Sequence, residues 1–187
     1  VGMVRPTGVV IVRDTCFVYD ALQTPAMHDL YQALASNVDR SRMIASDVEK
    51  AVMEGRCPLI LTERIEHLES LDALLANIPC RKVLLKGGMG KKQRRAAMEQ
   101  LRATDGVRIV MATGRYIGEG FDDPRLDTLF LALPISWAGT LQQYVGRLHR
   151  SHEGKQALVV YDYVDSQVPT LQRMFQRRSR GYRALGY

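Results

Sequence analysis

The sequence predicts an α/β fold, in which a parallel sheet is sandwiched by helices. Two patterns indicate this: the short predicted strands are apolar almost throughout, and they alternate with segments of helical periodicity. The length of 187 residues, with 46% hydrophobic and 25% charged side chains, fits one globular domain with a core. No apolar run approaches the roughly 18 residues that a membrane span needs.

The elements follow in order along the chain. Residues 1–24 are predicted to form lead-in strands or an interdomain linker, and residues 25–187 the domain itself. Two helices come first, and Gly55 is placed to end the second. Strands and helices then alternate, over 57–62, 64–77, 81–86, 91–103, 106–113, 126–134, 141–150, 156–164 and 169–185. The basic, acid-free tail, residues 176–187, is expected to fray rather than to extend a binding face.

The charge balance points to an anionic partner. The formal net charge is +6, and 20 of the 26 basic residues are Arg, whose planar fork suits phosphate. An Arg-rich codon bias explains the composition equally well. Cys16, Cys57 and Cys80 are odd in number and far apart, so we expect reduced thiols in a cytoplasmic protein, and no metal site.

The segment LQQYVGRLHR, residues 141–150, is predicted to form an amphipathic helix. Its apolar side consists of Leu141, Val145 and Leu148. Its polar ridge consists of Gln143, Arg147 and Arg150. Thr140 and Gln143 would fit a capping box, which explains Gln143 without any ligand. Gly146 costs about 1 kcal/mol relative to Ala in a helix, so its presence suggests that another group approaches the backbone there.

One segment imitates a phosphate-binding loop. KGGMGKK, residues 86–92, follows a predicted strand and opens a helix. The motif G-x-x-x-x-G-K-[ST] requires a Gly where this chain has Leu85, and a hydroxyl where it has Lys92. The chain therefore lacks the half of an ATPase that holds phosphates and metal.

Four motifs in sequence order resemble those of superfamily 2 helicases. Residues 143–150 contain Q-x-x-G-R-x-x-R, which resembles the last motif of that family, and MATGRYIGEGFDDP, residues 111–124, resembles the motif before it. LILTERIEHLESL, residues 59–71, and LLKGGMGKKQRRAAMEQLR, residues 84–102, resemble the two earlier motifs. The chain thus resembles the C-terminal RecA-like domain of a DEAD/DEAH-type helicase, strongly over residues 58–150 and weakly over residues 1–57.

The resemblance implies a second motor domain with a RecA-like sheet of the P-loop NTPase superfamily but no P-loop of its own. In such helicases ATP lies between two RecA-like domains, and the N-terminal domain, absent here, holds Mg²⁺. Arg147 and Arg150 would be arginine fingers, with Gln143 organising the same contact and Gly146 close to the nucleotide. Gly120 and Asp122 would bind the nucleotide, although an Asx-type turn before Pro124 also explains Asp122.

The resemblance also implies a track for DNA or RNA at the ends of the strands. The residues carried over to this role are Thr62, Arg64, Gly87, Gly88, Thr113 and Arg115. An exposed surface arginine explains Arg64 or Arg115 equally well, taken singly. Gly114 stands where an Asp often follows Ala-Thr in DEAD-box proteins, so the contacts of that position differ here.

The expected function is the C-terminal motor domain of an ATP-dependent helicase that works as a monomer with its own N-terminal RecA-like domain, away from membranes. This fragment alone is expected to be inactive. The alternatives are a double-strand DNA translocase of the restriction or remodelling type, and a non-catalytic nucleic-acid-binding module. A small-molecule enzyme on a Rossmann-like sheet is disfavoured because the sequence lacks the dinucleotide fingerprint. The sequence does not distinguish DNA from RNA, or unwinding from translocation.

Overall fold

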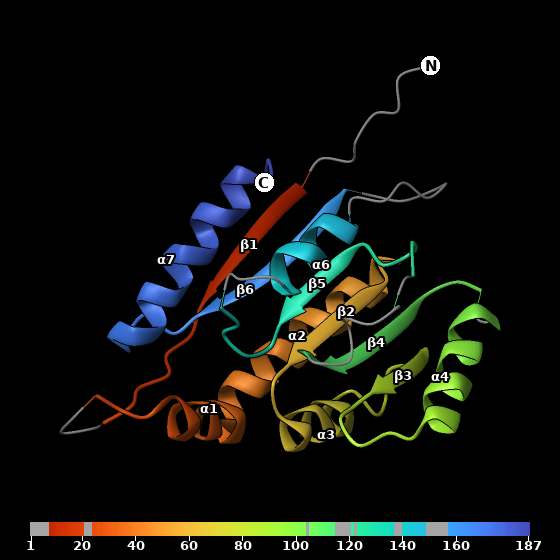
Figure 1. Ribbon diagram of the computed structural model, residues 1–187, viewed down its shortest axis with the longest axis horizontal. Coiled ribbons are helices and arrows are strands. Elements are labelled where there is room, and N and C mark those ends of the chain that lie inside the picture. Colours follow the sequence, from red (N-terminus) through yellow and green to blue (C-terminus); the bar gives the residue numbers. More distant parts are fainter. Residues whose placement is uncertain are drawn as a thin grey trace.

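The computed structural model describes residues 8–20, 24–103, 105–114, 121, 123–136, 140–148 and 157–187, without the side chains of Thr140 and Arg147. Six parallel strands form one sheet in the order β1-β6-β5-β2-β4-β3 (Figure 1). The strands are β1 (Gly8–Asp14), β2 (Pro58–Thr62), β3 (Arg81–Leu85), β4 (Arg108–Thr113), β5 (Thr128–Leu131) and β6 (Leu158–Val164). The predicted α/β class with a parallel sheet is confirmed.

Helices cover both faces of the sheet, as the apolar strands require. They are α1 (Met27–Ser36), α2 (Val38–Met53), α3 (Ile65–Leu74), α4 (Lys91–Ala103), α6 (Thr140–Leu148) and α7 (Pro169–Ala184). Helices α4, α6 and α7 pack on one face, and α2 and α3 on the other (Figure 1). Within the described residues, no helix is long and apolar enough to cross a membrane.

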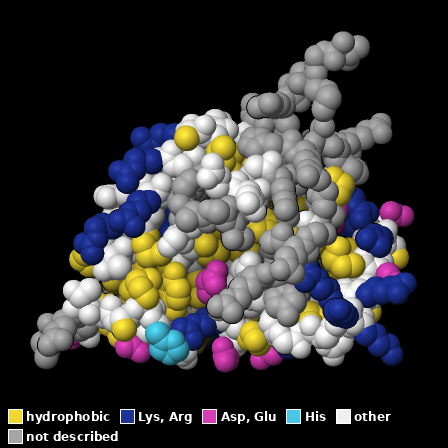
Figure 2. All heavy atoms as spheres, in the orientation of Figure 1, with side chains coloured by type: hydrophobic (Ala, Val, Ile, Leu, Met, Phe, Trp, Pro, Cys, Tyr) yellow, Lys and Arg dark blue, Asp and Glu magenta, His cyan; other side chains and the backbone are white. Residues whose placement is uncertain are grey.

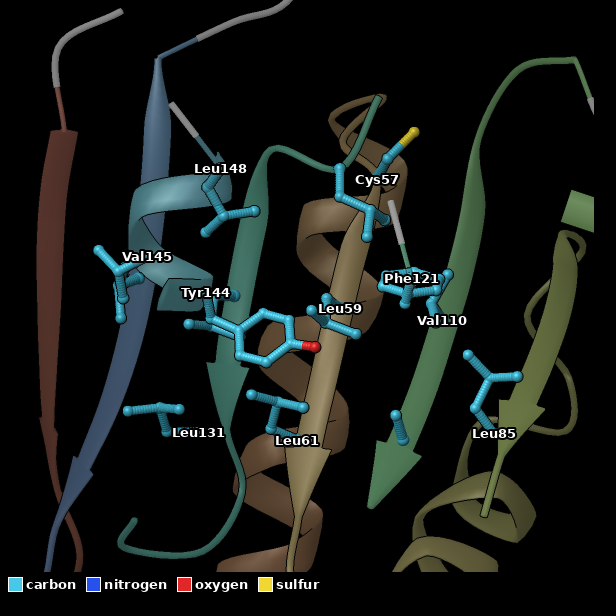
Figure 3. Packing of buried hydrophobic residues seen from close by; sticks show 14 of the residues in the cluster. Cys57, Leu59, Leu61, Leu85, Val110, Phe121, Leu131, Tyr144, Val145 and Leu148 are labelled. Atoms are coloured by element: carbon cyan, nitrogen blue, oxygen red, sulfur yellow. The ribbon is translucent and has the colours of Figure 1, made fainter. Parts of the chain in front are cut away.

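The core has one layer on each side of the sheet. Alternate residues of β2 divide between the layers: Leu59 and Leu61 face α6, whereas Ile60 faces α2 and α3. Figure 3 shows the first layer, with Leu148 and Val145 of α6 lying against the strands. A smaller cluster around Leu30 and Leu34 fixes α1 beside the loops that follow β5 and β6.

Local signals set the ends of α2. The Asn37 side chain accepts a hydrogen bond from the backbone N–H of Arg40 at 2.9 Å, which satisfies a donor of the first turn. Gly55 has a φ of 78°, a left-handed conformation that favours glycine after a helix. The predicted end of this helix at Gly55 is confirmed.

The prediction that the C-terminal tail frays is wrong. Helix α7 continues to Ala184, and Arg178 and Tyr182 are 1% and 2% exposed. The Asp162 carboxylate of β6 accepts from Arg178 Nε and Nη2 at 2.8 Å each, and from Tyr182 Oη at 2.8 Å. The final residue, Tyr187, lies so close to Gly8 of β1 that a Cβ at Gly8 would collide with its ring.

Strand β1 falls in the predicted lead-in segment and pairs with β6 from Gly8 to Asp14. It is therefore an edge strand of the same sheet. The boundary at residue 24 between a lead-in segment and the domain stays a prediction.

Candidate nucleotide and nucleic-acid interface

Helix α6 presents one buried side and one exposed side, as its sequence predicts. Leu141, Val145 and Leu148 are at most 4% exposed and belong to the core cluster on the sheet. Figure 3 shows Val145 and Leu148 there, together with Tyr144. Gln142, Gln143 and Gly146 are exposed. The side chain of Arg147 and all of Arg150 lie outside the described residues, so their positions stay predictions from the helical pattern. The same holds for the proposed cap at Thr140.

Nothing in the described part of the chain approaches Gly146. A Cβ built at this position would meet no atom within 4 Å. A glycine in a helix interior destabilises it by about 1 kcal/mol relative to Ala, and packing against the described residues does not explain that cost. With respect to the described residues, the space above Gly146 is therefore open.

The segment between β5 and α6 is held by three side chains from three different helices. Arg40 of α2 donates to the Ala132 carbonyl, and Tyr31 Oη of α1 donates to the Pro134 carbonyl at 2.6 Å. Arg178 Nη1 of α7 donates to the Ile135 carbonyl at 3.3 Å. Because these carbonyls precede α6 in the chain, the three donors restrict where the helix begins.

The end of β2 forms a turn at the carboxyl edge of the sheet, in which Thr62 is buried and Glu63 is exposed. Thr62 is fully buried, and its hydroxyl lies 2.9 Å from Nδ1 of His67. The backbone N–H of Arg64 donates to the same hydroxyl at 3.4 Å. The Arg64 guanidinium donates to the carbonyl of His28 and lies 3.0 Å from its Nδ1. Both predicted nucleic-acid residues of this turn already have partners within the chain.

The structure brings two other predicted track residues together. The backbone N–H of Gly87, after β3, donates to Oγ1 of Thr113 at the end of β4, at 3.2 Å. Gly88 follows with a φ of 84°, which only glycine adopts readily. Arg115, Gly120 and Asp122 lie outside the described residues, and their roles stay predictions.

The side chain of Glu63 lies beside Gly114. The Glu63 carboxylate occupies the place where a Cβ of Gly114 would be. Glu63 follows β2 and Gly114 follows β4, and these strands are paired neighbours. An Asp at 114 would place a second carboxylate beside that of Glu63 unless the exposed Glu63 side chain moved away.

Comparison with known proteins fits this arrangement. The helicase conserved C-terminal domain family matches residues 42–152, which is more than half of the chain. The chain belongs to this family. The four segments that resemble helicase motifs, residues 59–71, 84–102, 111–124 and 143–150, all lie within the matched residues.

Relatives of this helicase C-terminal domain are found among viral proteins. The chain is 26% identical over 158 residues to transcript termination protein A18 of fowlpox virus (strain NVSL), which covers 82% of the chain and 34% of the relative. It is 34% identical over 76 residues to uncharacterized protein 108L of invertebrate iridescent virus 3, which covers 41% of the chain and 68% of that protein. The chain thus spans about a third of the length of A18.

Solved structures show the same fold. T4 UvsW matches 95% of the chain with a TM-score of 0.72 and 16% identity, over 40% of the UvsW chain. Domain 2 of the DEAD-box helicase Mss116p, bound to an RNA duplex, matches 86% of the chain with a TM-score of 0.55 and 14% identity, over 55% of that chain. The fold of the domain is therefore that of RecA-like helicase C-terminal domains.

A buried polar network in this helicase domain was not predicted from sequence. Arg40 pairs with Asp165 through Nε at 2.9 Å and Nη2 at 3.2 Å, and Thr15 Oγ1 donates to the same carboxylate. The neighbouring Ser41 Oγ lies 3.4 Å from His67 Nε2. The network therefore joins the residues that follow strands β1, β2, β5 and β6 through the first turn of α2.

Burial fixes the charge states within this network. Desolvation, with the adjacent Arg40 charge, lowers the pKa of His67 from 6.5 to about 3, so the imidazole is neutral near pH 7. Burial, with the nearby Glu63 carboxylate, raises the pKa of Tyr31, so its hydroxyl keeps the proton that it donates to Pro134. Within the described residues, no group of three His, Cys, Asp or Glu side chains could hold a metal ion.

Proposed function

We propose that this domain is the second motor domain of an ATP-dependent nucleic-acid helicase, and that Arg147 and Arg150 act as arginine fingers on ATP held by a preceding RecA-like domain. The observation that carries this proposal is helix α6. Its apolar side is buried, the segment before it is anchored by three helices, and Gln143 and Gly146 remain exposed. A fixed helix with an open polar side suits a ligand that arrives from another domain.

The chemistry required of this side is charge stabilisation. In phosphoryl transfer, negative charge spreads over the transferred group, and an arginine finger accelerates the reaction by about 10³–10⁵. By the helical pattern of the sequence, Arg147 and Arg150 would lie one turn apart on the same ridge, which would allow both guanidinium groups to reach one triphosphate. Gln143 would orient this contact, and the open backbone at Gly146 would let the phosphates approach. Gly120 and Asp122 would contact the nucleoside.

ATP would bring Mg²⁺ held by the other domain, where the metal neutralises charge on the phosphates. The residues of this chain would position the hydrogen-bond donors and leave room for the nucleotide at Gly146. The contacts to the segment before α6 would keep this helix in one position. Isolated from the other domain, it would hold no complete site.

The nucleic-acid track would lie at the carboxyl edge of the sheet. Thr62 is fully buried, so its hydroxyl would act by fixing the turn at Arg64 rather than by contacting the strand. The Gly87–Thr113 hydrogen bond would likewise fix the glycine loop after β3. Backbone N–H groups, Arg64 and Arg115 would then contact phosphates. The binding of an RNA duplex by domain 2 of Mss116p supports a track on this domain.

The test is nucleic-acid-stimulated ATP hydrolysis and strand separation by the full-length protein, with DNA, RNA and hybrid duplexes. Stimulated hydrolysis with strand separation supports the helicase. Stimulated hydrolysis without separation identifies a translocase, and binding without hydrolysis identifies a non-catalytic module; both overturn the proposal.

The viral relative supports a narrower second candidate. The similarity to transcript termination protein A18 favours a motor that acts on a transcript, for which an RNA–DNA hybrid would be the preferred duplex. Equal unwinding of DNA and hybrid duplexes would contradict this second candidate and leave the first intact.

A further inference from the structure

The outer side of helix α7 carries a stripe of arginines that are not part of the proposed nucleotide site. The stripe consists of Arg173, Arg177, Arg180 and Arg183, all exposed. At a rise of about 1.5 Å per residue it extends along about 15 Å of the helix. Figure 2 shows Lys and Arg side chains along the part of the surface where α7 lies in Figure 1. Helix α7 lies outside residues 42–152, so the family match assigns it nothing.

The arginine stripe has no acidic counterpart on its own helix. No Asp or Glu follows Asp165 in the sequence. Among the described residues, no salt bridge involves the stripe, and Arg173 and Arg183 donate to hydroxyls of Thr170 and Ser179. Like charges three or four residues apart destabilise a helix. By contrast, Arg95 of the equally basic α4 pairs with Glu99 at 3.0 Å.

Helix α7, which carries the stripe, is anchored to strand β6 on its buried side. Arg178 pairs with Asp162 on the buried side of α7, and Tyr182 donates to the same carboxylate. Although desolvation alone lowers the pKa of Arg178, the Asp162 carboxylate raises it above its ordinary value, so this buried pair stays charged. The outward arginines are thus presented on a fixed scaffold, which reduces the ordering cost of binding.

We propose that the arginine stripe of α7 binds the phosphodiester backbone of the same nucleic-acid strand and extends the track beyond the carboxyl edge of the sheet. This inference rests on the proposed function, because it takes nucleic acid as the partner. Helix α7 begins at Pro169, just after β6 ends at Val164, so its first turn lies at that edge. A series of arginine forks without base-reading neighbours suits phosphates of any sequence.

The apolar side of α7 argues against an anionic membrane as the partner. Helices that lie in a membrane surface bury an apolar side in the lipid. In α7 that side is already used, because Leu171 and Tyr182 are buried against the rest of the domain. None of the large hydrophobic residues exposed in the described part of the chain belongs to α7.

The experiment compares binding of a fluorescent single-stranded oligothymidylate across a salt series. The test variant of the full-length protein is Arg177→Gln/Arg180→Gln. Arg42→Gln/Arg81→Gln is the matched control, because it removes two exposed arginines of α2 and β3 and the same net charge. Each lost phosphate contact lowers the slope of log affinity against log salt by about 0.7. Two lost contacts therefore lower this slope by about 1.4. If the variant and the wild type bind equally at about 1 M salt, the variant then binds roughly 25-fold more weakly at about 0.1 M salt.

The expected result is this loss in the α7 variant, a much smaller loss in the control, and partial recovery in Arg177→Lys/Arg180→Lys. Equal affinity and slope in wild type and α7 variant, or an equal loss in the control, would overturn the inference. So would a loss of binding to phosphatidylserine vesicles or to an acidic polypeptide, with oligonucleotide binding unchanged. If the wild type binds no nucleic acid, the proposed function itself fails, and that is seen before any variants are compared.

Discussion

Acidification from about pH 7 to about pH 5 should destabilise the domain through His67. This imidazole is fully buried between the hydroxyls of Thr62 and Ser41, with the Arg40 charge nearby. Its pKa falls from 6.5 to about 3 on folding. Between pH 6.5 and about 3, His67 is therefore mostly protonated in the unfolded chain and mostly neutral in the folded chain.

The size of the effect follows from the pKa difference. Since the folded pKa is depressed, the full stability is present above pH 6.5 and is lost progressively as the pH falls toward about 3. Each unit below 6.5 costs about 1.4 kcal/mol, so at about pH 5 the loss is about 2 kcal/mol. For a domain of this size, that corresponds to a fall in melting temperature of about 4–8 °C. Aspartates and glutamates titrate mostly near pH 4, below this window.

The measurement is the free energy of unfolding in urea at several pH values, for the wild type and for His67→Gln. Glutamine keeps an amide that can bond to the Thr62 hydroxyl, but it does not titrate. The wild type should lose about 2 kcal/mol more than the variant between about pH 7 and about pH 5. An identical loss in both proteins would refute the assignment of a buried, neutral His67.

Three other outcomes are expected. Asp162→Asn should lower the free energy of unfolding by about 3–5 kcal/mol, since it leaves the Arg178 charge buried without its partner; a near-native urea midpoint would contradict this. Tyr31→Phe should reduce ATP turnover of the full-length protein severalfold more than Tyr163→Phe does, because Tyr31 donates to the segment before α6, whereas Tyr163 donates to Asp47. Each should cost only about 0.5–1.5 kcal/mol of stability in a thermal melt, and equal turnover in the two would count against the positioning role. The chain alone should hydrolyse no ATP above background, because it lacks a P-loop; turnover that survives repurification and disappears in Arg147→Ala would be evidence against this.

Periodicity was sufficient to predict the sheet and its helices because each element has a strong local pattern. Strand β2 is buried at all five positions and reads as a continuous apolar run. Helix α6 has its apolar residues on one side, and the structure buries that side. The order of the strands within the sheet depends on contacts between distant segments, which a local pattern does not contain.

The buried ion pairs could not be predicted in the same way. Arg178 was assigned to a fraying tail because that tail is basic and lacks acids, yet its partner, Asp162, lies in a strand. The sequence did contain one signal of this pair, the carboxylate of Asp162 within an otherwise apolar strand, because a buried charge requires a partner. The bond of His67 to Thr62 was likewise missed, since a histidine in a helical pattern does not reveal what it faces. The finger and nucleoside residues remain predictions, because Gly120, Asp122, Arg150 and the side chain of Arg147 lie outside the described residues.

The most direct test of the arginine-finger proposal is nucleic-acid-stimulated ATP hydrolysis by the full-length protein carrying Arg147→Ala, beside its melting curve. Gln142→Ala is the matched control, an exposed residue of the same helix off the polar ridge. Arg147→Ala should lower the turnover number by about 10³ or more, with a much smaller change in ATP affinity and less than about 0.5 kcal/mol of lost stability. Arg147→Lys should recover little, because an ammonium lacks the planar fork. Near-normal turnover in Arg147→Ala would contradict the assignment and reduce the ridge of α6 to a solvated surface.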